Sequence, residues 1–119
     1  KNIKGVCDKK VGSLTNIPYK DESFDYVYVC EALEHSLNID KSIRECLRVL
    51  RPEGILLVID KPIEKLGMMQ IEEWERWISD EEMKYIAVKT CTKLHIVPQI
   101  SYEGRDDGLF RGWIFEKMK

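Results

Sequence analysis

The chain lacks the features that mark membrane, secreted and nucleic-acid-binding proteins. No apolar run approaches the ~18 residues of a membrane-spanning helix, and the longest, residues 55–59, has the length of a strand. Positive charge is not in excess, since 19 Lys and Arg residues face 21 Asp and Glu residues. The net charge of −2 argues against a nucleic-acid partner or an acidic membrane surface. No signal peptide is recognised, and we expect a cytoplasmic protein.

The chain also lacks paired cysteines. The four cysteines are widely and irregularly spaced, and no C-x-x-C pair occurs: Cys7, Cys30, Cys46 and Cys91. We expect buried, reduced thiols, because free cysteine behaves as a small hydrophobe. A zinc site needs close Cys or His pairs, and His35 and His95 lie far apart without a ligand at helical spacing. The sequence therefore predicts no metal site.

What is present is the composition of one folded domain. The 119 residues are 44% hydrophobic and 34% charged, which is too apolar for a disordered chain. This length favours a single domain over residues 1–119. The chain opens with Lys1 rather than Met, which suggests a processed or partial chain.

A strand, a helix and a second strand follow one another in the first half of the chain. Residues 24–30 (FDYVYVC) are rich in aromatic and β-branched residues and predict a strand. Apolar residues recur at helical spacing over 39–50, with Asp40 as the expected N-cap and a turn at 51–54 as the stop. The continuous apolar run 55–60 (ILLVID) is typical of a strand in a parallel sheet. This βαβ unit predicts the α/β fold class.

The second half predicts two helices and a closing hairpin. Residues 68–78 have the pattern of an amphipathic helix, and 79–89 open with SDEE, which has capping-box spacing. Residues 94–102 and 109–116 predict an antiparallel hairpin, with the first strand at a sheet edge because Pro98 cannot donate a hydrogen bond. The residues expected to face inward from the second helix are Met83, Ile86 and Ala87.

Several short motifs occur in a defined order. The chain reads VGSLTNIPYKDESFDYV at 11–27, LEH at 33–35, ECLRVLRPEG at 45–54 and DGLFRGWIF at 107–115. In this order and spacing they resemble the motifs of the class I S-adenosylmethionine-dependent methyltransferases of the small-molecule type. The resemblance implies a Rossmann-like sheet of order 3-2-1-4-5-7-6, with strand 7 antiparallel. It also implies S-adenosylmethionine as cofactor and methyl transfer to a small molecule.

The chain departs from the family at two residues and in one larger feature. The acidic residue that approaches adenine in the family is Ser13 here, and one glycine of its P-G-G turn is Glu53. The glycine-rich cofactor loop G-x-G-x-G does not occur in these 119 residues. The acidic residue that ends the second strand of the family is also absent, unless Asp8 takes its place. We therefore expect a partial sheet, with strands equivalent to 3 (near Val11), 4, 5, 6 and 7, flanking helices, and a domain truncated on its N-terminal side.

The resemblance also assigns candidate site residues. Ser13 and Leu14 correspond to the adenine side of the cofactor site. The three residues after strand 4 would lie beside the methionine part of the cofactor, a solvated strand end being the alternative: Cys30, Glu31 and Ala32. His35 is a candidate catalytic base, with local packing as its alternative.

Other residues admit a structural and a functional interpretation. Asp25 is expected to satisfy nearby backbone donors, and Glu45 and Arg48 to form an i,i+3 ion pair. Asp60 and Lys61 follow strand 5 at the ligand-binding end of the sheet, although charged strand ends are common. Four further residues form either a substrate lid or, as we favour, part of the core: Met68, Met69, Trp74 and Trp77.

Two functions from different classes remain open. The first is methyl transfer to a small molecule by a class I methyltransferase of which this chain is part, with the activity of the chain alone left open. The second is a non-catalytic relic or interaction module. A third hypothesis, another doubly wound nucleotide-binding enzyme, lacks its phosphate loop here. Because strand 4 would lack its neighbour, its edge should be covered by the preceding segment, by a second copy in a homodimer, or by a missing half.

Overall fold

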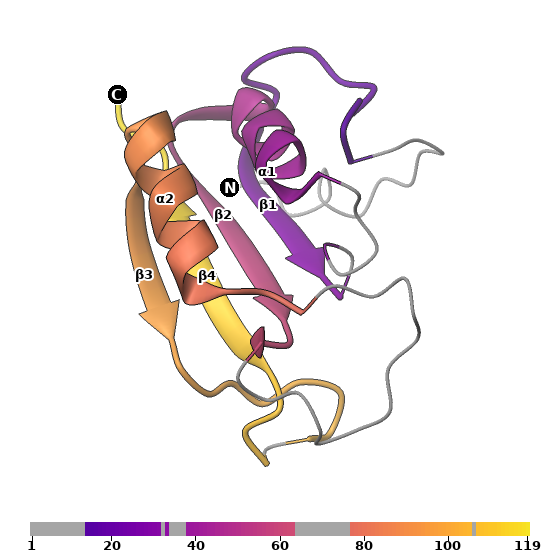
Figure 1. Ribbon diagram of the computed structural model, residues 1–119. Helices are drawn as coiled ribbons and strands as arrows, with labels where there is room; N and C mark the ends of the chain where they lie inside the picture. The colour runs from indigo at the N-terminus through magenta and orange to yellow at the C-terminus, as the bar shows by residue number, and fades with distance from the viewer. Residues whose placement is uncertain (1–13, 32, 34–37, 64–76, 106) are drawn as a thin grey trace.

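The computed structural model describes residues 14–31, 33, 38–63, 77–105 and 107–119. Strands and helices alternate in the first part of the chain, and a pair of strands closes it (Figure 1). The elements are β1 (Phe24–Cys30), α1 (Ile39–Arg48), β2 (Leu50–Asp60), α2 (Asp80–Thr90), β3 (Lys93–Val97) and β4 (Arg111–Glu116).

The four strands form one mixed sheet in the order β1-β2-β4-β3. β1 and β2 are parallel, joined by the crossover helix α1, whereas β4 runs antiparallel to both β2 and β3. This confirms the α/β class and the order 4-5-7-6 that the family resemblance implied. The strand expected near Val11 falls mostly outside the described residues, and Leu14 lies in a turn.

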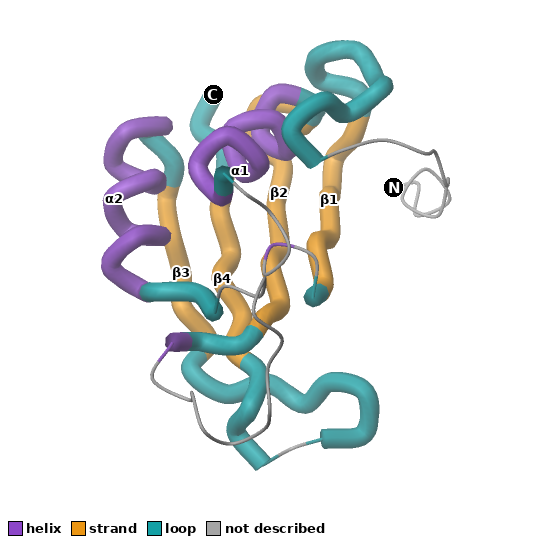
Figure 2. The backbone as a smooth tube through the Cα atoms, turned by 45° about the vertical axis from the view of Figure 1, so that its right-hand side comes forward, coloured by secondary structure: helices purple, strands orange, loops and turns teal. Residues whose placement is uncertain are grey.

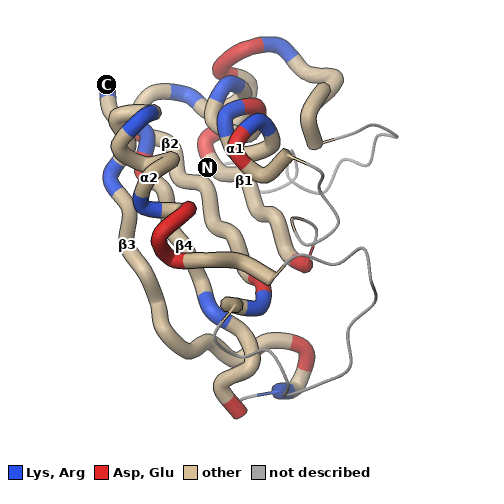
Figure 3. Tube along the Cα trace, in the orientation of Figure 1, with Lys and Arg blue, Asp and Glu red and all other residues tan. Residues whose placement is uncertain are grey.

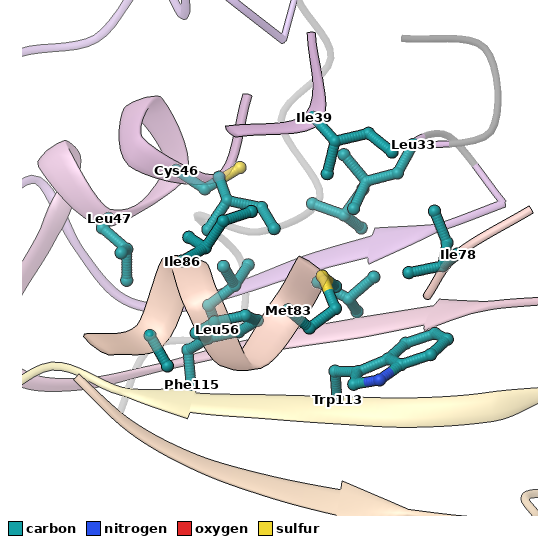
Figure 4. Close-up of a cluster of buried hydrophobic side chains, with 14 of the residues drawn as sticks. Leu33, Ile39, Cys46, Leu47, Leu56, Ile78, Met83, Ile86, Trp113 and Phe115 are labelled. Atoms are coloured by element: carbon teal, nitrogen blue, oxygen red, sulfur yellow. The ribbon is translucent and has the colours of Figure 1, made fainter. Parts of the chain in front are cut away.

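Both helices lie on the same face of the sheet and bury the main core against it (Figure 2). Leu56 and Val58 of β2 and Trp113 and Phe115 of β4 are all fully buried in this core. Figure 4 shows Leu56, Trp113 and Phe115 beneath α2. These positions alternate along each strand, as expected for one face of a pleated sheet. The predicted inward face of α2 is confirmed, because Met83, Ile86 and Ala87 are buried.

The N-terminus of α1 begins two residues earlier than the predicted cap. Asn38, not Asp40, is the N-cap, and its side-chain oxygen accepts a hydrogen bond from Lys41 N at 2.9 Å. Asp40 instead lies in the first turn and pairs with Arg44. Both residues are good caps, so composition did not distinguish them.

The predicted turn at 51–54 lies inside β2 rather than before it. Phe24 pairs with Leu50 and Tyr26 pairs with Ile55, so four residues of β2 face a single residue of β1. Within this excursion Glu53 adopts a left-handed φ of 70°. A Cβ on Gly54 would lie 2.8 Å from the Arg51 carbonyl oxygen and 2.9 Å from that of Asp25, so only glycine fits there.

A charged network ties the segment before β1 to α1. The predicted ion pair is confirmed, with Arg48 and Glu45 2.8 Å apart. Glu45 also accepts the Ile17 backbone N–H at 2.7 Å, while Arg48 donates to the Ile17 carbonyl and to Asp21. Both signs of charge are intermixed in α1 and in the adjoining loop (Figure 3). Asp25 pairs with the Arg51 guanidinium at 3.1 Å, a side-chain partner that the sequence did not predict.

In the second half of the chain, α2 has about its predicted length, whereas β3 is shorter than predicted. Ser79 caps α2 as expected, accepting from the backbone N–H groups of Glu81 and Glu82. The helix predicted over 68–78 lies largely outside the described residues, and Ile78 forms a bridge to Pro62 rather than a helical turn. β3 stops at Val97, because Pro98 cannot continue the ladder, and it occupies the predicted sheet edge.

The expectation of buried thiols holds for only part of the set. Cys46 is buried in the core, Cys30 is half-buried, and Cys7 lies outside the described residues. Cys91 is exposed and forms the left-handed C-cap of α2, which corrects the prediction for this residue. Among the described residues, no helix is long and apolar enough to cross a membrane.

Candidate functional site

The candidate site lies where the two parallel strands end. β1 ends at Cys30 and is followed by Glu31, and β2 ends at Asp60 and is followed by Lys61. These two strand ends lie side by side, since Cys30 pairs with Ile59. Charged segments gather at these strand ends and at the start of β4 (Figure 3). In open α/β sheets, ligands bind outside the carboxyl ends of parallel strands. The described residues at this edge are therefore the candidates for ligand contact.

Glu31 leaves β1 in a backbone conformation that most residues avoid. Its φ is 56°, in the left-handed region, and its N–H donates to the Ile59 carbonyl at 2.8 Å. Left-handed non-glycine residues store strain and are held by their surroundings, often at functional sites. The Glu31 carboxylate is partly exposed and lies 3.3 Å from the Lys61 Nζ.

Lys61 is a buried cation at this edge of the sheet. Its side chain is only 3% exposed, and its ammonium lies 5.7 Å from the centre of the Trp77 ring and 5.5 Å from that of Phe110. Both distances are within the range of cation–π attraction. The Ile78 N–H donates to the Lys61 carbonyl at 2.8 Å, which ties the Trp77 segment to the end of β2.

A neutral thiol and a neutral phenol lie next to the charged pair. Burial raises the pKa of the Cys30 thiol, and the charges of Asp60 and Glu31 raise it further, against the lowering effect of a hydrogen bond from Tyr102. Burial is also the main cause that raises the pKa of Tyr102 to about 12. The Tyr102 ring makes an edge contact with Phe110 at 5.0 Å. Because only the thiolate is nucleophilic, this arrangement favours binding and positioning over covalent catalysis by Cys30.

The structure brings together only part of the predicted site. Cys30 and Glu31 lie together at the carboxyl edge, as expected, whereas Leu14 lies in a turn and packs against the main core. Four of the predicted site residues lie outside the described part of the chain: Asp8, Ser13, Ala32 and His35. Among the described residues, no group of three His, Cys, Asp or Glu side chains is arranged to hold a metal ion.

Sequence reasoning missed the aromatic part of the site. Trp77 is buried, as the core interpretation held for this residue, but it also forms one wall around Lys61. Phe110 and Tyr102 belong to the connection between β3 and β4, which the sequence described only as a strand and turn. Their apolar rings, next to the charged end of β2, were the available signal. No periodicity in the sequence indicated that these segments meet.

Comparison with known proteins is consistent with this arrangement. Residues 1–58 match the family model described as "Methyltransferase domain". Norajmaline N-methyltransferase of Rauvolfia serpentina is 41% identical over 49 residues, which cover 41% of this chain and 17% of that protein. Phthiotriol/phenolphthiotriol dimycocerosates methyltransferase 1 of Mycobacterium ulcerans is 34% identical over 87 residues, covering 72% of this chain and 30% of that protein. The matched segments thus span less than a third of these two relatives.

The fold is similar to that of solved methyltransferases. A solved S-adenosylmethionine-dependent methyltransferase of Thermotoga maritima superposes with a TM-score of 0.69 at 19% identity, covering 89% of this chain and 62% of that one. The mixed sheet, the matched family model and this superposition define a Rossmann-like methyltransferase fold. The chain is thus similar to S-adenosylmethionine-dependent methyltransferases in the sequence of residues 1–58 and in its fold.

Proposed function

We propose that this chain is part of a class I methyltransferase that transfers a methyl group from S-adenosylmethionine to a small molecule. The observation that carries the proposal is the placement of Cys30 and Glu31 at the carboxyl edge of the parallel pair β1–β2. When bound, S-adenosylmethionine supplies an already activated methyl group, so the protein needs chiefly to align the acceptor and exclude water.

The residues at this edge fit that task. The Glu31 carboxylate is partly exposed and can accept hydrogen bonds from a polar ligand. The half-buried Cys30 thiol is held neutral by burial, so it offers a small uncharged surface rather than a reactive group. Phe110 and Trp77 supply apolar walls behind them. The names of the two relatives indicate different methyl acceptors, so the proposal for the acceptor stops at a small molecule.

The test is calorimetric titration of the chain with S-adenosylhomocysteine, the demethylated form of the donor. We expect saturable 1:1 binding that weakens about tenfold in Glu31→Gln, which removes a charge-assisted acceptor. Glu53→Gln is the matched control, because Glu53 is also a left-handed glutamate but lies at the opposite end of β2. Absence of heat from a folded chain at high ligand concentration would refute the proposal for this chain.

The second candidate function is an interaction module without catalysis. It is favoured by the position of β1, which lies at the end of the strand order and carries Tyr28 with 47% of its surface exposed. An edge strand offers unpaired backbone groups to a second chain. A chain that binds no cofactor but self-associates through β1 would support this candidate over the first.

A further inference from the structure

Lys61 is buried more completely than its partner. Its side chain is 3% exposed, against 30% for Glu31, so the ammonium lies within the fold while the carboxylate reaches toward solvent. A buried ammonium is costly unless it is paired and its surroundings are favourable. The Glu31 carboxylate pairs with this ammonium, and the rings of Trp77 and Phe110 lie against it.

Two separate anchors, one from β2 and one from the residue that follows it, hold Glu31. The Ile59 carbonyl receives the Glu31 N–H at 2.8 Å, and the Lys61 Nζ lies 3.3 Å from its carboxylate. The first anchor fixes a strained backbone with a φ of 56°. The second anchor, Lys61, fixes the direction in which the Glu31 side chain points. Together they determine where the Glu31 carboxylate lies relative to the carboxyl edge of the sheet.

The aromatic walls limit the motion of the ammonium. Trp77 comes from the segment before α2 and Phe110 from the segment before β4, so the walls belong to two different parts of the chain. Hydrogen bonds between Ile63 and Ile78 and between Ile78 and Lys61 hold the Trp77 segment against the end of β2. Lys61 is thus fixed by β2, the Trp77 segment and Phe110 at once.

We propose that Lys61 is a positioning residue, which holds the Glu31 carboxylate in the geometry that receives a hydrogen-bond donor of the methyl donor at the carboxyl edge of β1. The inference rests on the function proposed above. Lys61 itself does not touch the ligand, since its ammonium is enclosed by Glu31, Trp77 and Phe110. It acts through Glu31, and its effect on ligand binding depends on that carboxylate.

A double-mutant cycle on ligand affinity tests this dependence. S-adenosylhomocysteine affinity is measured by calorimetry for the chain, Lys61→Met, Glu31→Gln and the double variant, well below each unfolding midpoint. We expect each single change to weaken binding about tenfold, and the double variant to bind no more weakly than either single variant. Lys61→Arg keeps the charge and should restore part of the affinity, although its planar group does not match the lysine site.

Lys89→Met is the matched control. Lys89 also stacks on a ring, 5.6 Å from the centre of Tyr85, but it lies in the last turn of α2. Ligand affinity should be unchanged in this variant. Circular dichroism establishes that each variant is folded, and if Lys61→Met fails to fold, the comparison of Lys61→Arg with Glu31→Gln and their double variant takes its place.

The outcomes separate the two proposals. Unchanged affinity of Lys61→Met with a lower unfolding temperature would show a purely structural lysine and overturn the inference. Additive losses in the double variant would also overturn it, because Lys61 would then act independently of Glu31. If the wild-type chain itself binds no ligand, the proposed function fails first, and the inference falls with it.

Discussion

Cys46 and Cys91 are two cysteines whose thiols should differ strongly in reactivity, because one is buried and the other exposed. Burial is the main cause that raises the pKa of the Cys46 thiol to about 12. Cys91 is exposed at the end of α2. We therefore expect iodoacetamide to alkylate Cys91 readily in the native chain and Cys46 only after unfolding, because the thiolate is the reactive form. Peptide-resolved mass spectrometry measures both rates, and comparable native rates would contradict the burial of Cys46.

Glu45 makes stability depend on pH at the acidic end. The hydrogen bond from Arg48 is the largest cause that lowers the pKa of Glu45 from its ordinary value of 4.5, and the Ile17 N–H adds to it. A lowered folded-state pKa gives stability that is complete above the unfolded pKa and is lost as the pH falls through the folded pKa. The stability that the ionised Glu45 adds should therefore be complete at neutral pH and should decline below about pH 4.5.

Urea unfolding of the wild type and Glu45→Gln, from about pH 6 to about pH 3, measures this decline. The difference in free energy of unfolding between the two chains should shrink as the solution becomes acidic. Glu22→Gln, at an exposed position in the turn before β1, is the control and should show little difference at any pH. A constant difference for Glu45→Gln across the range would argue against the ion pair as its cause.

At the scale of the elements, the irregular part of β2 at residues 51–54 contains backbone strain that a substitution can relieve. Glu53 has a φ of 70°, where glycine is favoured, and the family has glycine at this position of the turn. A left-handed conformation costs a non-glycine residue about 1–2 kcal/mol. Glu53→Gly should therefore raise the free energy of unfolding by about 1 kcal/mol, after the added flexibility of the unfolded chain is subtracted.

Replacing a helical glutamate with glycine serves as the control, because it should lower the free energy of unfolding instead of raising it. Glu81→Gly, at an exposed position in the first turn of α2, should lower the free energy of unfolding by up to about 1 kcal/mol. Urea unfolding compares the two variants with the wild type. Destabilisation by both would show that the left-handed conformation of Glu53 costs little.

The elements differ in how far the sequence could predict them. The strand 24–30 and the apolar part of β2 follow from β-branched runs, and α2 follows from Ser79 and the acidic residues after it. The strand order came from the family resemblance, because pairing between β2 and β4 joins residues far apart in the chain. The start of β2 at Leu50 was missed, since Pro52 and Gly54 have the pattern of a turn. Leu50 counts as strand only because it pairs with Phe24 of β1, which is far away in the sequence.

The site shows the same division. Cys30 and Glu31 were assigned because they follow a recognisable strand, and position along a strand is local information. The role of Lys61 could not be assigned from the sequence, because its burial depends on Trp77 and Phe110, which come from two other segments. Single-sequence patterns record the periodicity of each element but not which loops meet at its end.

At the scale of the whole molecule, the sheet is covered unequally. Both described helices lie on one face, and among the residues that the structure describes no strand pairs with the outer edge of β1. We predict that the chain dimerises through this edge and that Tyr28→Lys weakens association about tenfold, because lysine on an edge strand opposes pairing. Sedimentation velocity over a range of concentrations measures the association.

Val88→Lys is the control for this prediction. Val88 is 75% exposed on α2, and this variant also replaces an exposed apolar side chain with a charged one. It should leave association unchanged. A chain that remains monomeric at all concentrations would exclude the homodimer, and an equal effect of both variants would place the contact elsewhere than β1.

The position of β4 has a consequence for synthesis on the ribosome. β4 is the last of the described strands to be translated, yet it lies between β2 and β3. Until residues 111–116 have emerged, a nascent chain holds one parallel pair and a third strand with no neighbour in this sheet. Such a pair is barely stable on its own. A stop codon shortly before residue 111 would therefore abolish folding of the whole domain, although it would remove none of the proposed site residues at the ends of β1 and β2.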